Sequence, residues 1–177
     1  TYQLYKENPT AFTPPLATGA NAQALGSGSF ARHTGSLAHS SGVFGTLGDA
    51  QSGEYILRGI TTAAAWTDLF LDGISDKLIL DDYSTWGAFI TISARRFDVV
   101  NEVALFTLQL SLDRASGPSS VRILPGMTKS VLGRDDNTWD VKATDDTYNG
   151  ALGLSVKGQG GHTIRWVARV ATTEVTN

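Results

Sequence analysis

The stretch NAQALGSGSFARHTGSLAHSSGVFGTLG, from Asn21 to Gly48, repeats with a period of seven residues. Its units are NAQALGS, GSFARHT, GSLAHSS and GVFGTLG, and the last three carry Phe30, Leu37 and Phe44 at their third position. The glycines exclude a coiled coil, because each interior glycine costs a helix about 0.8–1 kcal/mol relative to alanine and the paired apolar positions are missing. The pattern is typical of a β-structure that coils and stacks, with one short strand and one tight corner per unit.

The large apolar residues of the repeat predict an oligomer. Their neighbours are glycine, alanine and serine, which supply too little apolar area for one copy to enclose Phe30, Leu37 and Phe44. Copies that meet about an axis can enclose them. We therefore predict a homotrimer in which these three residues pack between copies.

The segment ATGANAQALGSGSFA, residues 17–31, resembles the head repeats of trimeric autotransporter adhesins. The resemblance implies a left-handed parallel β-roll with two units per coil. Such repeats also occur in bacteriophage tail fibres and other virion proteins. The segments YKENPTAFTPPLATG (residues 5–19), GDAQSGEYILRGITT (48–62) and GHTIRWVARVATTEV (161–175) are similar to segments of those proteins. The chain as a whole resembles a phage fibre or virion surface protein.

Composition divides the chain into three zones. Residues 1–18 hold Pro9, Pro14 and Pro15 and are expected to form an extended arm that contacts another chain. Residues 19–53 are the repeat zone. Residues 54–177 show long alternating patterns separated by turn clusters such as Pro125-Gly126.

The alternation in the third zone predicts antiparallel strands with one buried face. It is clear in WGAFITISARR (86–96), EVALFTLQLSLDR (102–114) and HTIRWVARV (162–170). No segment has ten residues of helical periodicity. We expect an all-β fold in which the arm and a short glycine-rich β-repeat precede an antiparallel, jelly-roll-like β-sandwich. The expected core residues are Ile90, Ile92, Phe106, Leu108, Leu110, Leu154 and Trp166.

Charge and composition exclude several functions. Among 177 residues the net charge is −3 without a sustained basic run, so we expect no nucleic-acid partner. Cysteine is absent, and no apolar run approaches the roughly 20 residues that a membrane helix needs. The start Thr1-Tyr2-Gln3 lacks a signal segment. These features fit a virion surface protein that is assembled in the host cytoplasm.

Three aspartate pairs precede aromatic residues, and two hypotheses explain them. In the first, an exposed indole stacks on a sugar of a host cell-surface glycan while a carboxylate binds its hydroxyls. In the second, which we favour, the aspartates cap turns and the aromatic residues pack inward. The candidate glycan-binding residues are Asp82, Trp86, Asp136 and Trp139.

No catalytic, metal or cofactor site is predicted. The histidines His33, His39 and His162 are dispersed and lack a ligand pattern. The chain also lacks a Gly-x-Ser-x-Gly elbow, and no carboxylate pair stands out as hydrolytic. We therefore expect a protein that is not an enzyme.

The function predicted from the sequence is that of a phage virion protein. We expect a trimeric fibre or its distal module that contributes to host attachment and contacts other virion proteins through the arm. A trimeric capsid decoration protein is the alternative, and a bacterial adhesin head is a weaker one.

Overall fold

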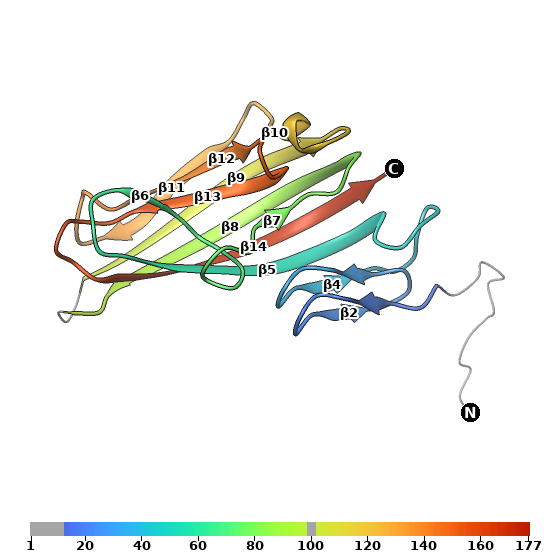
Figure 1. The fold of residues 1–177 in the computed structure, drawn as a ribbon, viewed down its shortest axis with the longest axis horizontal. Coiled ribbons are helices and arrows are strands. Elements are labelled where there is room, and N and C mark those ends of the chain that lie inside the picture. Colours follow the sequence, from blue (N-terminus) through green and yellow to red (C-terminus); the bar gives the residue numbers. More distant parts are fainter. Residues whose placement is uncertain (1–12, 99–101) are drawn as a thin grey trace.

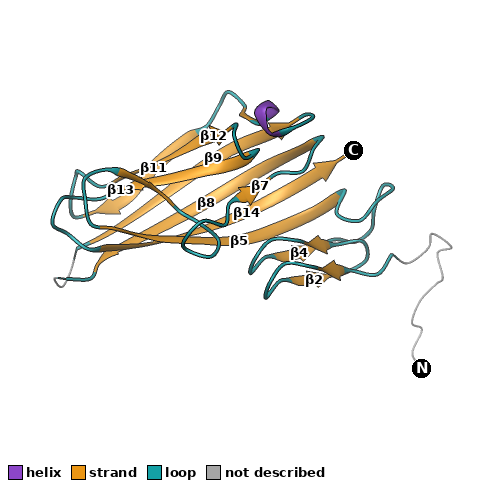
Figure 2. Cartoon of the chain, in the orientation of Figure 1, coloured by secondary structure: helices purple, strands orange, loops and turns teal. Residues whose placement is uncertain are grey.

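The computed structural model describes residues 13–98 and 102–177, which form β-strands and loops with one short helical turn (Figures 1 and 2). That turn is the 3-10 helix η1 (Pro118–Ser120), and no helix in these ranges could cross a membrane. The strands are β1 (Leu16–Ala17), β2 (Gln23–Leu25), β3 (Phe30–Ala31), β4 (Leu37–His39), β5 (Ala50–Thr61), β6 (Trp66–Asp68), β7 (Leu78–Ile79), β8 (Ser84–Arg96), β9 (Val103–Arg114), β10 (Arg122–Ile123), β11 (Thr128–Arg134), β12 (Asp140–Asp146), β13 (Ala151–Lys157) and β14 (Ile164–Thr176).

Two sheets of unequal size form a sandwich. The large sheet has the order β10-β9-β8-β14-β5-β4-β2, and β11 also pairs with β9. Its long strands β5, β14, β8 and β9 are antiparallel neighbours. The smaller sheet of β12, β13, β6 and β7 lies against one face of it (Figure 1). The predicted antiparallel β-sandwich is therefore confirmed.

The core lies between the two sheets, because alternate side chains of the long strands point to opposite faces. All the predicted core residues are buried: Ile90, Ile92, Phe106, Leu108, Leu110, Leu154 and Trp166. Trp166 is fully buried, and its ring centroid lies 6.5 Å from that of Phe106 and 5.8 Å from that of Trp139. Its indole Nε1 donates a hydrogen bond of 2.9 Å to Thr61 Oγ1, which satisfies the one polar atom of the side chain.

The repeat zone forms two coils, called here the β-roll (residues 16–39). β1 pairs with β3 and β2 pairs with β4, both in parallel. Leu16 lies opposite Phe30 and Gln23 opposite Leu37, an offset of 14 residues that equals two seven-residue units. Each of the first three units thus supplies one strand, and β1 lies just before the first unit. The fourth unit, residues 42–48, forms a loop instead of the expected strand, and two units complete a coil. The buried side chains of this region are small: Ser29, Ala31, Ser36 and Ala38.

The β-roll continues the large sheet, since β4 pairs with β5. Gln51 strengthens this junction: its Oε1 accepts the Phe30 amide at 2.9 Å, and its Nε2 donates to Glu174 Oε2 at 2.8 Å. Glu174 is buried and also accepts a hydrogen bond from the Tyr55 hydroxyl at 2.5 Å. The predicted division between residues 53 and 54 falls inside β5, and this domain boundary stays a prediction.

The predicted arm, residues 1–18, lies mostly outside the described residues. In its described part, Pro14 and Pro15 are exposed, and Leu16 and Ala17 form β1. The contact of the arm with other virion proteins stays a prediction.

Candidate functional site

The two tryptophans proposed to bind a sugar are buried, so that hypothesis is wrong for their indoles. Trp86 is 2% exposed and stacks on Tyr55 with ring centroids 5.7 Å apart. Trp139 is fully buried and packs against Trp166. Trp86 is one of the alternate side chains of β8 that point into the core. Trp139 lies in the core directly before β12 begins. Neither ring can present a face to a ligand.

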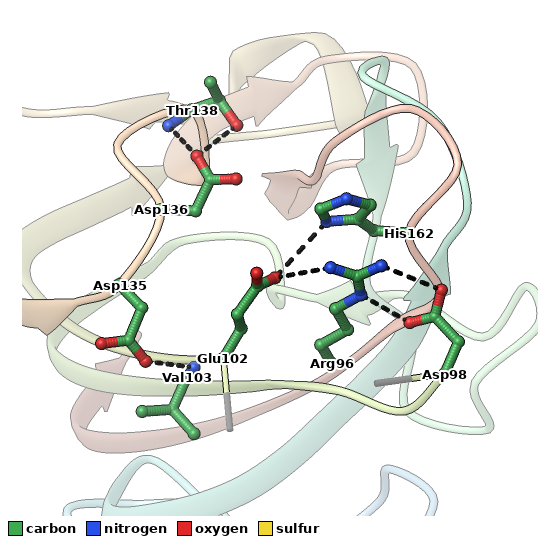
Figure 3. Close-up of polar contacts among 8 residues, drawn as sticks. All are labelled: Arg96, Asp98, Glu102, Val103, Asp135, Asp136, Thr138 and His162. Atoms are coloured by element: carbon green, nitrogen blue, oxygen red, sulfur yellow. Dashed lines mark hydrogen bonds and ion pairs between the residues drawn. The ribbon is translucent and has the colours of Figure 1, made fainter. Parts of the chain in front are cut away.

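The two aspartates of that hypothesis hold loops in place. Asp82 Oδ1 accepts the Gly117 amide at 3.1 Å and lies 2.7 Å from Arg114 Nη2. Asp136 Oδ1 accepts both the amide and the hydroxyl of Thr138 at 2.7 Å (Figure 3). Burial alone would raise the pKa of Asp136, but these hydrogen bonds hold it below its usual range. Asp136 therefore caps its own turn, as the favoured hypothesis predicted, whereas Asp82 contacts a segment that is distant in the chain.

A charged cluster lies near Asp136, where β8 ends and β9 begins (Figure 3). Arg96 Nε lies 2.8 Å from Asp98 Oδ1, and its Nη1 lies 3.1 Å from Glu102 Oε2. His162 Nδ1 is 3.5 Å from the same Glu102 oxygen. The hydrogen bond from Arg96 lowers the pKa of Asp98.

The contacts of the charged cluster connect three segments at this end of the sandwich: the β8–β9 connection, the segment at Asp135 and the segment at His162. Asp135 Oδ2 accepts the Val103 amide at 2.9 Å, so each carboxylate drawn there already has a partner. The sequence did not predict this cluster, because Arg96 and His162 come from distant segments and no local motif links them. Within the described ranges, no group of three or more histidine, aspartate or glutamate side chains could hold a metal ion.

The residues predicted to pack between copies lie on the outside of the repeat zone. Leu37 is 36% exposed and Phe44 is 82% exposed, whereas Phe30 is half-buried beneath the Arg32 guanidinium, 4.5 Å from its ring centroid. Leu16 and Leu25 are also exposed, by 42% and 50%. The large apolar side chains of this zone therefore lie mainly in contact with solvent.

The loop that carries Phe44 is held by a buried carboxylate. Asp49 accepts the amides of Phe44, Gly45 and Thr46 at 2.9, 2.6 and 2.7 Å. Burial alone would raise the pKa of Asp49, but these amides lower it below its usual range. Phe44 is thus presented from a loop whose backbone is fixed by hydrogen bonds.

The second face of the large sheet is open, and it carries a shallow groove of about 550 Å³. Small residues of adjacent strands form its floor, among them Gly87, Ser111 and Ala171. Phe89, which is 42% exposed, and the Pro125-Gly126 turn also line it. The hollow arises because three neighbouring strands place small side chains in the same region.

A second hollow, of about 290 Å³, lies on the same open face between β5, β14 and the loop at Asp72. Arg58 and Arg165 line it together with Ile60 and Val167. Arg58 Nη2 donates to the Asp72 carbonyl at 2.7 Å, which fixes the guanidinium. The hollow, called here the arginine pocket, combines cationic and apolar lining.

No protein-family model and no curated protein matches the chain. Among solved structures it is similar to the tailspike protein gp49 of Acinetobacter baumannii bacteriophage Fri1, described as a capsular polysaccharide depolymerase. That similarity has a TM-score of 0.41 and 14% identity, and it covers 72% of this chain and 18% of the other.

A second similar structure is the tailspike protein of Acinetobacter baumannii phage AM24, with a TM-score of 0.36 and 9% identity. This similarity covers 69% of this chain and 27% of that tailspike. The chain therefore spans less than a third of the length of either protein.

The description of one of these neighbours bears on one expectation from the sequence. The sequence predicted a protein that is not an enzyme, on the ground that no catalytic motif stood out. The Fri1 tailspike is described as a depolymerase, which contradicts that prediction, and the prediction is withdrawn.

Proposed function

We propose that this chain is a surface component of a bacteriophage virion, a fibre or its distal module, which forms a homotrimer and contributes to host attachment. The observation that carries the proposal is the outward placement of the large apolar side chains in the repeat zone. The resemblance of residues 17–31 to the head repeats of trimeric adhesins and phage fibres supports the same assignment.

A single copy leaves the side chains of Leu25, Leu37 and Phe44 in contact with water. Full burial of one such side chain stabilises an assembly by about 1.5–3 kcal/mol. The interior of the β-roll cannot take them, because it is already filled by alanine and serine. Association with further copies is the arrangement that removes all three from water.

Hydrogen bonds to the Asp49 carboxylate fix the backbone of the loop that carries Phe44, which makes Phe44 suitable as an anchor residue of an interface. A side chain presented from a fixed backbone loses less conformational freedom on association than one on an unrestrained loop. Large aromatic anchors also contribute a disproportionate share of binding energy at interfaces. We therefore place Phe44 in the trimer contact, together with Leu25 and Leu37.

Light scattering coupled to size-exclusion chromatography tests the proposal. We expect three chains of 18.8 kDa for the unaltered protein and a smaller species for the triple variant Leu25→Ser, Leu37→Ser, Phe44→Ser. The control is Ile74→Ser, because Ile74 is 78% exposed on a loop of the sandwich. A monomer at micromolar concentration, or a trimer that survives the triple substitution, would contradict the proposal.

A count of copies per virion then separates the two virion roles. A fibre is expected in tens of copies, whereas a capsid decoration protein, the alternative, is expected in hundreds.

A further inference from the structure

Three arginines from three strands lie together on the open face of the large sheet. Arg165 of β14 lies directly opposite Arg95 of β8 and, on its other side, Ile60 of β5. Arg58 of β5 lies opposite Val167, two residues along β14 from Arg165, which makes it a diagonal neighbour of Arg165. Directly opposed side chains have Cβ atoms about 4.5–5.5 Å apart, and diagonal ones about 7–8 Å. The three cations thus form one patch.

The charges of this patch are uncompensated by ion pairs. Within residues 13–98 and 102–177, none of Arg58, Arg95 and Arg165 forms an ion pair, whereas nearby Arg169 lies 2.6 Å from Glu54 Oε2. Like charges placed directly opposite each other destabilise a sheet. An anion that binds across the patch would offset this repulsion. The chain as a whole carries a net charge of −3, so the patch is also opposite in sign to the rest of the molecule.

The carboxylate that lines the arginine pocket belongs to Asp72, and its own loop already engages it. Asp72 Oδ1 accepts the amides of Ile74, Ser75 and Asp76 at 2.8–2.9 Å. Arg58 contacts this segment through backbone carbonyls, donating to Asp72 O at 2.7 Å. A guanidinium has five N–H donors, so Arg58 keeps donors for a ligand.

The pocket also offers an apolar surface of limited size. Ile60 and Val167 line it and are 56% and 47% exposed. Beside it, the Arg165 guanidinium lies 3.8 Å from the ring centroid of Phe97, which is 62% exposed. This stacking orients Arg165 while leaving its in-plane donors available. A volume of about 290 Å³ suits one ring rather than an extended protein surface.

We propose that the arginine pocket, with Arg95 beside it, binds a carboxylated sugar ring of an acidic polysaccharide. Arg165 and Arg95 would bind the carboxylate through charge-assisted hydrogen bonds, the strong class of such contacts. The apolar C–H face of the ring would rest on Ile60 and Val167. This inference rests on the proposed attachment role for its biological meaning, and it assigns that role to residues distinct from the buried tryptophans.

Calorimetric titration of the full chain with tetragalacturonate tests the proposal. We expect saturable binding that weakens as the sodium chloride concentration rises from roughly 50 to 500 mM, because salt screens the charges. Arg165→Gln and Arg95→Gln should each weaken binding roughly tenfold or more, and Arg165→Lys should give an intermediate loss. The matched control is Arg122→Gln, since Arg122 lies on β10 at the far edge of the sheet and pairs with Asp113.

Two further probes assign the ligand class. The methyl-esterified tetramer should not bind, because it has the same rings without the carboxylates. Tetraglutamate should bind at least tenfold more weakly than tetragalacturonate, because it lacks the ring that contacts the apolar lining. Equal binding of tetraglutamate would overturn the sugar assignment in favour of an acidic protein. Absence of tetragalacturonate binding, or equal loss in Arg122→Gln, would overturn the pocket itself.

This experiment is independent of the oligomeric state. A monomer that binds the acidic tetramer would contradict the trimer and retain the pocket. A trimer that does not bind the acidic tetramer would support the trimer proposal and overturn the pocket.

Discussion

The sandwich encloses large side chains between its two sheets, whereas the repeat zone leaves most of its large side chains on the outside. Trp166 and Phe106 are fully buried between two sheets, while Phe44 and Leu25 lie exposed beside an interior of alanine and serine. A sandwich separates its sheets by about 10 Å, which leaves room for aromatic rings. A coil of 14 residues places its strands too close for large side chains. The difference shows that the sandwich supplies its own core and that the β-roll depends on what lies next to it.

The largest expected effect is in the sandwich core. Trp166→Ala should lower the free energy of unfolding by about 3–5 kcal/mol, through a cavity beside Trp139 and the lost hydrogen bond to Thr61. Urea denaturation at several protein concentrations measures it. Val167→Ala is the control, because the adjacent residue points to the open face and should change the unfolding free energy by about 0.5 kcal/mol or less. Similar losses for both variants would contradict the assignment of the two faces.

The junction between the two regions should respond to acid through His33. Its ring packs edge-on against Tyr55, with centroids 5.5 Å apart. Burial, followed by the nearby Arg32 charge, lowers its pKa from 6.5 to about 4, although Asp76 acts in the opposite direction. The unfolded chain therefore binds more protons than the folded chain between these two values.

The sign of the effect follows from that difference in bound protons. Stability should be constant above the unfolded pKa of 6.5 and should fall as the pH drops toward 4, by roughly 3 kcal/mol at most. Urea denaturation across this pH range should show a slope that His33→Gln removes. His39→Gln should retain the slope, because His39 is exposed. An unchanged slope in His33→Gln would show that another group is responsible.

The smallest effect tests the interior of the β-roll. Ala38→Leu places a large side chain where the native residue is 2% exposed, and overpacking should cost about 1–3 kcal/mol. Hydrogen exchange should then show faster exchange in residues 16–39, while β8, β9 and β14 keep their protection. Unchanged protection of the β-roll would mean that its interior has room for large residues, and the comparison with the sandwich would fail.

The sequence predicted what depends on short-range periodicity. Alternation in β8, β9 and β14 identified the buried face, and the seven-residue period indicated a β-structure that coils and stacks. The number of two units per coil was implied by the resemblance to adhesin head repeats. The repeat also predicted that one copy would not enclose Phe30, Leu37 and Phe44; Leu37 and Phe44 are exposed, whereas Phe30 is half-buried beneath Arg32. Each of these properties depends on residues that are neighbours along the chain or one coil apart.

The sequence could not predict features that depend on strand register. The aspartate–aromatic motifs left two hypotheses open, and the register of β8 decides for the favoured one at Trp86, whose side chain points inward. Arg58, Arg95 and Arg165 are widely separated in the chain, and the pairing of β14 with both β5 and β8 brings them together. The cluster around Glu102 and His162 likewise depends on which strand ends meet.

Because β4 pairs with β5, the protein can become longer by adding coils to the β-roll. One ladder of hydrogen bonds runs from the sandwich into the coils, so added coils would extend the molecule along that ladder without altering the sandwich. The unit of such growth is 14 residues. Inserting seven would move each upstream strand to the opposite side of the coil and so exchange the partners of β1 and β2. Gene duplications that lengthen the protein should therefore accumulate in even numbers of repeats.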